Sequence, residues 1–308
     1  MDKSLTMETT PTSPTLPATT PPPAPRHRFR RLLRSFGAAG LIGLAVLLFW
    51  LLAAVAGPAL LPAHLITSGD GNGDVFGPMS AAHWFGTDYL GRDMFVRVVE
   101  GARYTVGVAL VATVLASGTG TVLALFAAAM GGLVDATLSR VLDTLTAIPS
   151  KMFALLMVAG FGSSVTMLVV TAAIIYVPGA YRIARSLAVN INALDYVVVA
   201  RTRGEGTLYI MLREILPNIL GPMLADLGLR FVYVVLLLAS LSFLGLGIQP
   251  PSADWGSLVR ENIGALPDAG ASVIVPALAI ASLTIAVNLV IDNLPGRGRP
   301  AARERGGR

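Results

Sequence analysis

Residues 37–60 form an apolar run in which 24 consecutive positions carry no charged side chain. At about 1.5 Å per helical residue, such a run can cross the ~30 Å hydrocarbon layer of a membrane. A secretory signal peptide is the alternative, because Ala54, Val55 and Ala56 resemble a cleavage site. However, the apolar region of a signal peptide has only about 7–15 residues. The length of the run therefore favours a retained transmembrane helix.

Further apolar runs follow along the chain. They lie at about 103–129, 135–161, 164–185, 219–246 and 271–291. Hydrophobic residues make up 54% of the 308 residues and charged residues only 13%, about half of the charged share of an ordinary soluble domain. A soluble core cannot hide so much apolar surface, so lipid must cover part of it. We therefore expect an all-α, polytopic membrane protein with six transmembrane helices.

The run at 135–161 differs from the others because it carries charge. Asp135, Ser139 and Asp143 recur every four residues, so they share one face of a helix. Charged groups on such a face cannot point at lipid and must meet other helices, headgroups or water. Pro149 is expected to bend this helix or end it early.

Basic residues predict the orientation in the membrane. Five arginines lie in residues 26–34, directly before the first run. A basic run can bind nucleic acid, but this position favours a cytoplasmic anchor instead. Arg182, Arg185, Arg201, Arg203, Arg213 and the arginines after position 294 fall on the same side, whereas the opposite side holds Arg92, Arg97 and Arg260. The positive-inside rule therefore places both termini in the cytoplasm.

These features suggest a division of the chain into four parts. Residues 1–25 are rich in Thr and Pro and are expected to be a disordered cytoplasmic tail. Residues 26–102 contain the basic anchor, the first transmembrane helix and a polar outer loop. Residues 103–293 form the core with five transmembrane helices, and residues 294–308 form a basic cytoplasmic tail.

The segment 195–217 interrupts the apolar runs with charge. We predict a helix whose amino end is capped by Asp195, a left-handed turn at Gly204, and a second helix capped by Thr207. Pro217 is expected to mark the entry into the next span. The predicted apolar stripe of the second helix consists of Leu208, Leu212, Ile215 and Ile219. From these residues alone, a solvated amphipathic linker and a docking surface remain equally open.

The stretch ARTRGEGTLYIMLREILPN, residues 200–218, resembles the cytoplasmic EAA signature of binding-protein-dependent ABC importer permeases. Ala200, Gly204 and the Ile-Leu-Pro at 215–217 match the signature. Val198 and Val199 depart from it, standing where an acidic residue and an alanine are usual. Other stretches resemble the dipeptide/oligopeptide/nickel branch, and most closely its C-type permease. They lie at 83–103, 141–150, 239–259 and 288–294.

The resemblance implies a type I ABC importer permease fold in the bacterial cytoplasmic membrane. It also implies a second permease subunit in a heterodimer, two cytoplasmic ATPase subunits and an extracytoplasmic solute-binding protein. Peptides are the leading expected substrate, with nickel or a metal chelate as the alternative. The expected ATPase-coupling residues are Val198, Val199, Ala200, Arg201, Arg203, Gly204, Ile215, Leu216 and Pro217.

We expect no catalysis and no cofactor on this chain itself. A phosphate-binding loop needs a lysine after a Gly-rich turn, and the only lysines are Lys3 and Lys151, neither in that context. ATP and magnesium should therefore bind to the partner ATPases. The absence of cysteine and the scattered three histidines argue against a metal site. A secondary carrier or channel that works without ATP is a further alternative, and an intramembrane enzyme lacks a catalytic cluster.

Two more groups of residues are candidates for function. The segment FGTDYLGRD contains Gly86, Thr87, Asp88, Gly91, Arg92 and Asp93, which could contact solute or binding protein but are more typical of a structural turn at an outer gate. Asp143, Asp226 and Arg230 are candidate pathway-lining residues. The spacing of Asp226 and Arg230 instead favours a pair between successive turns of one helix.

Overall fold

The computed structural model describes residues 37–60 and 74–294, all of which belong to one compact unit. The predicted tail at 1–25 and the basic run at 26–34 lie outside the described residues. The predicted tail at 294–308 also lies outside them, except for its first residue. The described part of the chain is helical, with a single isolated β-bridge between Thr87 and Asp93.

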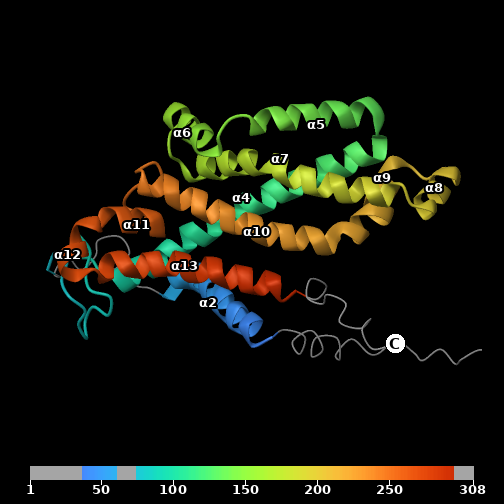
Figure 1. The fold of residues 1–308 in the computed structure, drawn as a ribbon. Coiled ribbons are helices and arrows are strands. Elements are labelled where there is room, and N and C mark those ends of the chain that lie inside the picture. Colours follow the sequence, from blue (N-terminus) through green and yellow to red (C-terminus); the bar gives the residue numbers. More distant parts are fainter. Residues whose placement is uncertain (1–36, 61–73, 295–308) are drawn as a thin grey trace, which may run out of the picture. The chain divides into compact units, whose positions relative to one another are not determined.

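Figure 1 shows the order and packing of the helices. The long helices are α2 (Ala38–Leu60), α4 (Met94–Met130), α5 (Gly132–Thr146), α6 (Ser150–Phe161), α7 (Val165–Asn192), α10 (Leu216–Phe243) and α13 (Ala271–Asp292). Shorter elements are α8 (Asp195–Thr202), α9 (Thr207–Tyr209), a π-helix (Ile210–Ile215), α11 (Trp255–Glu261), a 3₁₀ turn (Ile263–Ala265) and α12 (Leu266–Ala269).

Within the described residues, five helices are long and apolar enough to cross a membrane, or six if the bent pair of α5 and α6 counts as one span. The predicted all-α membrane fold is therefore confirmed. The fifth predicted run forms one continuous stretch from Thr207 to Phe243, because α9, the π-helix and α10 follow one another without a break.

The predicted third span is not one straight helix. The axes of α5 and α6 differ by 81°, and the break falls directly before Ser150. Pro149 precedes the first residue of α6, as expected for a residue that lacks an amide hydrogen and cannot continue a helix. The sequence therefore indicated the position of the break correctly, although not the size of the bend.

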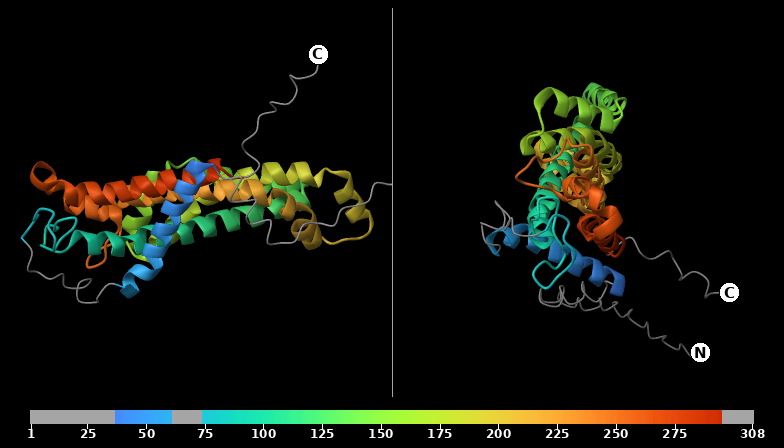
Figure 2. Two further views of the ribbon diagram at one scale, coloured as in Figure 1. Left: turned by 90° about the horizontal axis from the view of Figure 1, so that it is seen from below. Right: turned by 90° about the vertical axis from the view of Figure 1, so that its left-hand side faces the viewer.

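The helix α4 lies at the centre of the bundle and packs against α2, α7 and α10 (Figures 1 and 2). Small residues allow the close contact of α4 with α7. A Cβ atom at Gly120 would lie only 2.8 Å from the amide nitrogen of Tyr181 and 2.9 Å from the carbonyl oxygen of Val177. Such small residues are typical of packing between helices in a membrane.

The amino end of α4 corrects the predicted outer loop, which extended to residue 102. The helix begins at Met94 because the Asp93 carboxylate accepts a hydrogen bond from the Val96 amide at 3.1 Å and caps the first turn. Charged residues in the first turns of a helix are easily taken for a loop when only the sequence is considered, and this explains why the predicted loop was too long.

Candidate functional sites at opposite ends of α4

The segment 195–217 forms a helix, a left-handed turn and a second helix, beyond the carboxyl end of α4. The prediction for Gly204 is confirmed, since its φ is +85°. The predicted cap is wrong: Leu194 is the N-cap of α8, and Asp195 lies in the first turn without a capping hydrogen bond. Leu194 does not cap through a side chain either, so α8 is held mainly by packing.

The two faces of α8 have different surroundings. Val197 and Ala200 are fully buried, and Val197 belongs to an apolar cluster with residues of α4, α7 and the π-helix. Val198 and Val199 lie on the other face and are 49% and 52% exposed. Arg203 is also exposed. The face of α8 that carries the two valines is therefore not covered by the described part of this chain.

The second helix differs from its prediction in its cap and in its stripe. Gly206, not Thr207, is the N-cap residue. Ile215 and Ile219 are buried as predicted, but Leu208 and Leu212 are 67% and 48% exposed. A π-helix begins at Ile210 and has more residues per turn than an α-helix. Residues three or four apart therefore do not stay on one face through this segment, and Leu208 and Leu212 do not lie on the buried side with Ile215 and Ile219.

Pro217 does not separate the second helix from the span. It lies in the first turn of α10, and the chain stays helical across the junction with the π-helix. Pro217 is exposed and Leu216 is half-buried. The second helix of the segment, which consists of α9 and the π-helix, is therefore an amino-terminal extension of α10 rather than a separate helix.

Arg201 is not a free charge beside the turn. Its Nη2 donates hydrogen bonds to the carbonyl oxygen of Ala129 at 2.8 Å and to Oδ1 of Asn192 at 2.9 Å. Asn192 in turn donates from Nδ2 to the carbonyl oxygen of Ala128 at 2.9 Å. These contacts join α8 and α7 to the last turn of α4. Asn192 was not predicted as a functional residue, because its partners are distant in sequence.

Residues 86–93 form a tight turn at the amino end of α4. Gly86 and Gly91 have φ values of +72° and +74°, which favour glycine. The buried Asp88 carboxylate accepts hydrogen bonds from the Arg92 amide at 2.9 Å and from Arg92 Nε at 2.6 Å. Thr87 is buried and its hydroxyl accepts from the Gly77 amide at 2.6 Å. The polar groups of the turn thus bond mainly within and around it.

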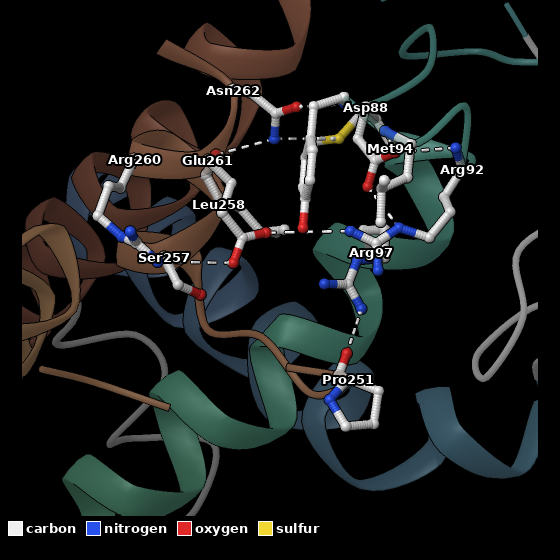
Figure 3. Close-up of polar contacts among 12 residues, drawn as sticks. Asp88, Arg92, Met94, Arg97, Pro251, Ser257, Leu258, Arg260, Glu261 and Asn262 are labelled. Carbon is white, nitrogen blue, oxygen red and sulfur yellow. Dashed lines mark hydrogen bonds and ion pairs between the residues drawn. The ribbon is translucent and has the colours of Figure 1, made fainter. Parts of the chain in front are cut away.

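A buried group of charged residues lies next to this turn, and Figure 3 labels four of them, Asp88, Arg92, Arg97 and Glu261. We call it the charge cluster; it consists of Asp88, Arg92, Arg97, Glu100 and Glu261. Arg97 Nη1 donates to Glu100 at 3.1 Å, and Arg92 Nη2 lies 3.9 Å from a carboxylate oxygen of Glu261. Burial raises the pKa of the Glu261 carboxyl, and the charges of Arg97 and Arg92 oppose that rise.

The charge cluster belongs to a wider set of contacts between α4 and the segment 248–262. Arg97 Nη1 also donates to the carbonyl oxygen of Pro251 at 2.9 Å, and the Trp255 indole donates to the carbonyl oxygen of Val98 at 2.8 Å. The Tyr89 amide donates to Asn262 at 3.0 Å. These contacts fasten α11 to the first turns of α4. Sequence reasoning placed Arg97 only in a loop and gave Glu100 and Glu261 no role.

Asp254 begins α11 in a buried position. Its carboxylate accepts hydrogen bonds from the Ser257 amide at 2.8 Å and from the Ser242 hydroxyl, and Ser257 completes a capping box. Burial raises the pKa of the Asp254 carboxyl, and the hydrogen bond from Ser242 opposes this. The cap therefore joins α11 to the end of α10.

Each candidate pathway residue forms an ion pair within the chain. Arg230 pairs with Asp226 on α10, and both are only 6% exposed. Asp143 pairs with Arg182 at 3.0 Å, and these side chains are more than half exposed. The predicted polar face of α5 meets α7 throughout, because Asp135 pairs with Arg185 and Ser139 bonds to Tyr181 at 2.9 Å.

Among the residues that the structure describes, no group of three His, Asp or Glu side chains is arranged to hold a metal ion. The contacts at both ends of α4 are hydrogen bonds and ion pairs within the chain. Their chemistry is that of structural joints between helices.

Comparison with known proteins relates the whole bundle to one family. The profile of the binding-protein-dependent transport system inner membrane component family matches residues 120–299. A provisionally named peptide transport system permease protein of Brucella suis is 37% identical over 269 residues, covering 86% of this chain and 88% of that protein. A dipeptide transport system permease protein of Alkalihalophilus pseudofirmus is 32% identical, covering 87% of each chain. A glutathione transport system permease protein of Pectobacterium atrosepticum is 35% identical, covering 70% of this chain and 71% of that protein.

Proposed function

The chain belongs to the family of binding-protein-dependent transport system inner membrane components, and from this premise we propose that it forms half of the translocation pathway for di- and oligopeptides. It is a non-catalytic, multi-pass permease component of an ABC transporter in the inner membrane, in the branch of peptide, dipeptide and glutathione permeases. Family membership implies ATPase and binding-protein partners. The proposed assembly adds a second permease subunit, two cytoplasmic ATPases that bind ATP and magnesium, and an extracytoplasmic binding protein.

The peptide substrate is supported by the chemistry that the relatives' names share. Peptide, dipeptide and glutathione permeases all act on short chains with amide bonds. Glutathione is itself a tripeptide and is the second candidate substrate, supported by the relative of Pectobacterium atrosepticum. Uptake of a labelled dipeptide, with glutathione as competitor, separates the two. Strong competition by glutathione together with poor dipeptide uptake would favour the second candidate.

The segment 195–217 is the proposed contact with the ATPase. The observation that carries this proposal is the exposed face of α8, on which Val198 and Val199 are uncovered. The opposite face of α8 packs against the bundle through the buried residues Val197 and Ala200. Gly204 then sets the direction of the second helix through its left-handed backbone. Arg203 lies exposed at the edge of the same face. In the proposed orientation both termini and this face are cytoplasmic.

The other candidate residues are proposed to keep the bundle in shape. The polar groups of residues 86–93 bond within the turn and to neighbouring segments of the same chain, which supports a structural role at the outer gate. The pair of Asp226 and Arg230 is proposed to hold α10 to its neighbours rather than to contact solute. The pair of Asp143 with Arg182 is more exposed and remains the better candidate for lining the pathway.

The coupling assignment is tested at Gly204. A β-branched residue is strongly disfavoured at a φ of +85°, so Gly204→Val should distort the turn although a Cβ there would have free space. We expect lower uptake and weaker co-purification of the ATPases. Gly206→Ala is the matched control, because Gly206 has an ordinary φ of −74° and equally free space. Normal uptake and normal ATPase co-purification in Gly204→Val would refute the assignment.

A further inference from the structure

The carboxyl end of α4 is closed by two side chains from other helices. The last turn of a helix leaves carbonyl oxygens without partners inside the helix. Here the carbonyl oxygen of Ala128 accepts from Asn192 Nδ2 at 2.9 Å, and that of Ala129 accepts from Arg201 Nη2 at 2.8 Å. A guanidinium at this position also interacts favourably with the negative end of the helix dipole. We call these four residues the α4 clamp.

The two side chains of the α4 clamp also bond to each other. Arg201 Nη2 donates a further hydrogen bond to Oδ1 of Asn192 at 2.9 Å. Both ends of the Asn192 amide are therefore in use, the nitrogen on α4 and the oxygen on Arg201. Since Asn192 ends α7 and Arg201 lies in α8, one network ties three helices together. Displacing α8 without α4 would break at least one of these bonds.

The helix α4 is suited to carry such a displacement over a long distance. Its 37 residues span about 55 Å at 1.5 Å per residue, well beyond the ~30 Å of hydrocarbon. It contains no proline. By contrast, α7, α10 and α13 each contain an internal proline, at Pro178, Pro222 and Pro276. At its far end, α4 is fastened to the segment 248–262 through Arg97 and Val98.

Figure 1 shows α8 and α11 at opposite ends of the bundle, with α4 running between them. From this arrangement we propose that Asn192 and Arg201 are positioning residues for energy coupling, which join α8 to α4 so that movement of α8 reaches the α11 end. The inference rests on the proposed function, in which α8 is the helix that the ATPase holds. It adds a residue outside the docking segment, Asn192, and assigns Arg201 to α4 rather than to the ATPase surface.

The experiment compares variants of the whole transporter, reconstituted in liposomes with its partner permease, its ATPases and its peptide-loaded binding protein. The readouts are ATPase co-purification and peptide transported per ATP hydrolysed. For Asn192→Ala and Arg201→Met we expect normal co-purification and about three- to tenfold less transport per ATP, the size expected for loss of a hydrogen bond. The matched controls are Asn190→Ala and Arg140→Met, since both side chains are exposed and neither has a hydrogen-bond partner among the described residues. The controls should transport normally.

Conservative variants keep the test decisive if the first pair assembles poorly. Arg201→Lys retains a charge that can reach one of the two acceptors, so it should recover part of the transport per ATP. Asn192→Asp keeps the acceptor for Arg201 but loses the donor to Ala128, so it should resemble Asn192→Ala. Wild-type transport per ATP in Asn192→Asp would overturn the proposal, as would loss of the ATPase in Arg201→Met. Failure of the proposed function shows separately, as a wild-type chain that does not co-purify with ATPases or does not transport peptide.

Discussion

Arg230 binds Asp226 with two hydrogen bonds across one turn of α10, from Nε to Oδ2 at 2.7 Å and from Nη2 to Oδ1 at 3.1 Å. Arg230 Nη1 also donates to the carbonyl oxygen of Tyr176 on α7 at 3.0 Å. Gly179 leaves room for this contact, because a Cβ atom there would lie 2.7 Å from Nη1. The pair therefore neutralises its own charge and joins α10 to α7.

The pair predicts an asymmetry between single and double variants. Asp226→Asn or Arg230→Met alone leaves one buried charge without its partner, which typically costs about 3–5 kcal/mol. We expect a large loss of melting temperature and of yield in detergent. The double variant Asp226→Asn/Arg230→Met leaves no charge and should recover most of the stability. Equal losses in the double and single variants would contradict a role in charge neutralisation. A stable double variant that no longer transports would instead point to contact with solute.

This pair also shows which contacts a sequence can predict. The spacing of Asp226 and Arg230 indicated their pairing, because residues four apart meet on any α-helix. The same rule placed Asp135, Ser139 and Asp143 on one polar face. The bond from Arg230 to Tyr176 was not predictable, since it depends on how two helices pack rather than on the geometry of one.

Two predictions failed for different physical reasons. The predicted stripe at Leu208 and Leu212 assumed a regular α-helix, but a π-helix from Ile210 to Ile215 changes which residues share a face. The charge cluster was missed because Glu261 is distant in sequence from Arg92 and meets it only when α11 packs at the amino end of α4. The turn at Gly204, by contrast, followed from the local preference of glycine for positive φ.

The contact between α4 and α7 predicts opposite outcomes for two glycines in the same helix. A Cβ atom at Gly120 would lie 2.6 Å from the Cβ of Ala180, whereas a Cβ atom at Gly118 has no atom within 4 Å. Gly120→Ala should therefore destabilise the bundle by about 1–3 kcal/mol through overpacking. Gly118→Ala should leave the melting temperature in detergent unchanged or raise it slightly. Equal melting temperatures for the two variants would show that α4 and α7 separate easily at this contact.

The proposed orientation can be tested directly, because the chain contains no cysteine. Met79 is 65% exposed at the amino side of α4, and Gly206 has free space around its Cβ position beyond the carboxyl end. In intact cells, a membrane-impermeant maleimide should label Met79→Cys rapidly. Gly206→Cys should react only after the membrane is permeabilised. The reverse pattern would mean that the termini and α8 face outward, and it would exclude α8 as a contact for a cytoplasmic ATPase.

The exposed valines of α8 predict the chemistry of the surface that receives them. Val198 stands where the resemblance to the EAA signature leads us to expect an acid, and its side chain is uncovered next to Val199. A partner groove matched to this chain would bury two apolar side chains and would offer no cation for a carboxylate. Val198→Glu should then place an unpaired charge in that groove, at a cost of about 1–3 kcal/mol.

That cost corresponds to roughly 5- to 150-fold weaker binding of the ATPase. We therefore expect less ATPase co-purification and less uptake for Val198→Glu, measured with the chain's own ATPases. Val198→Ile keeps the face apolar and should bind normally. Higher uptake in Val198→Glu would instead mean that the groove retains a basic residue, and that the native valine leaves this contact weaker than the acid would make it.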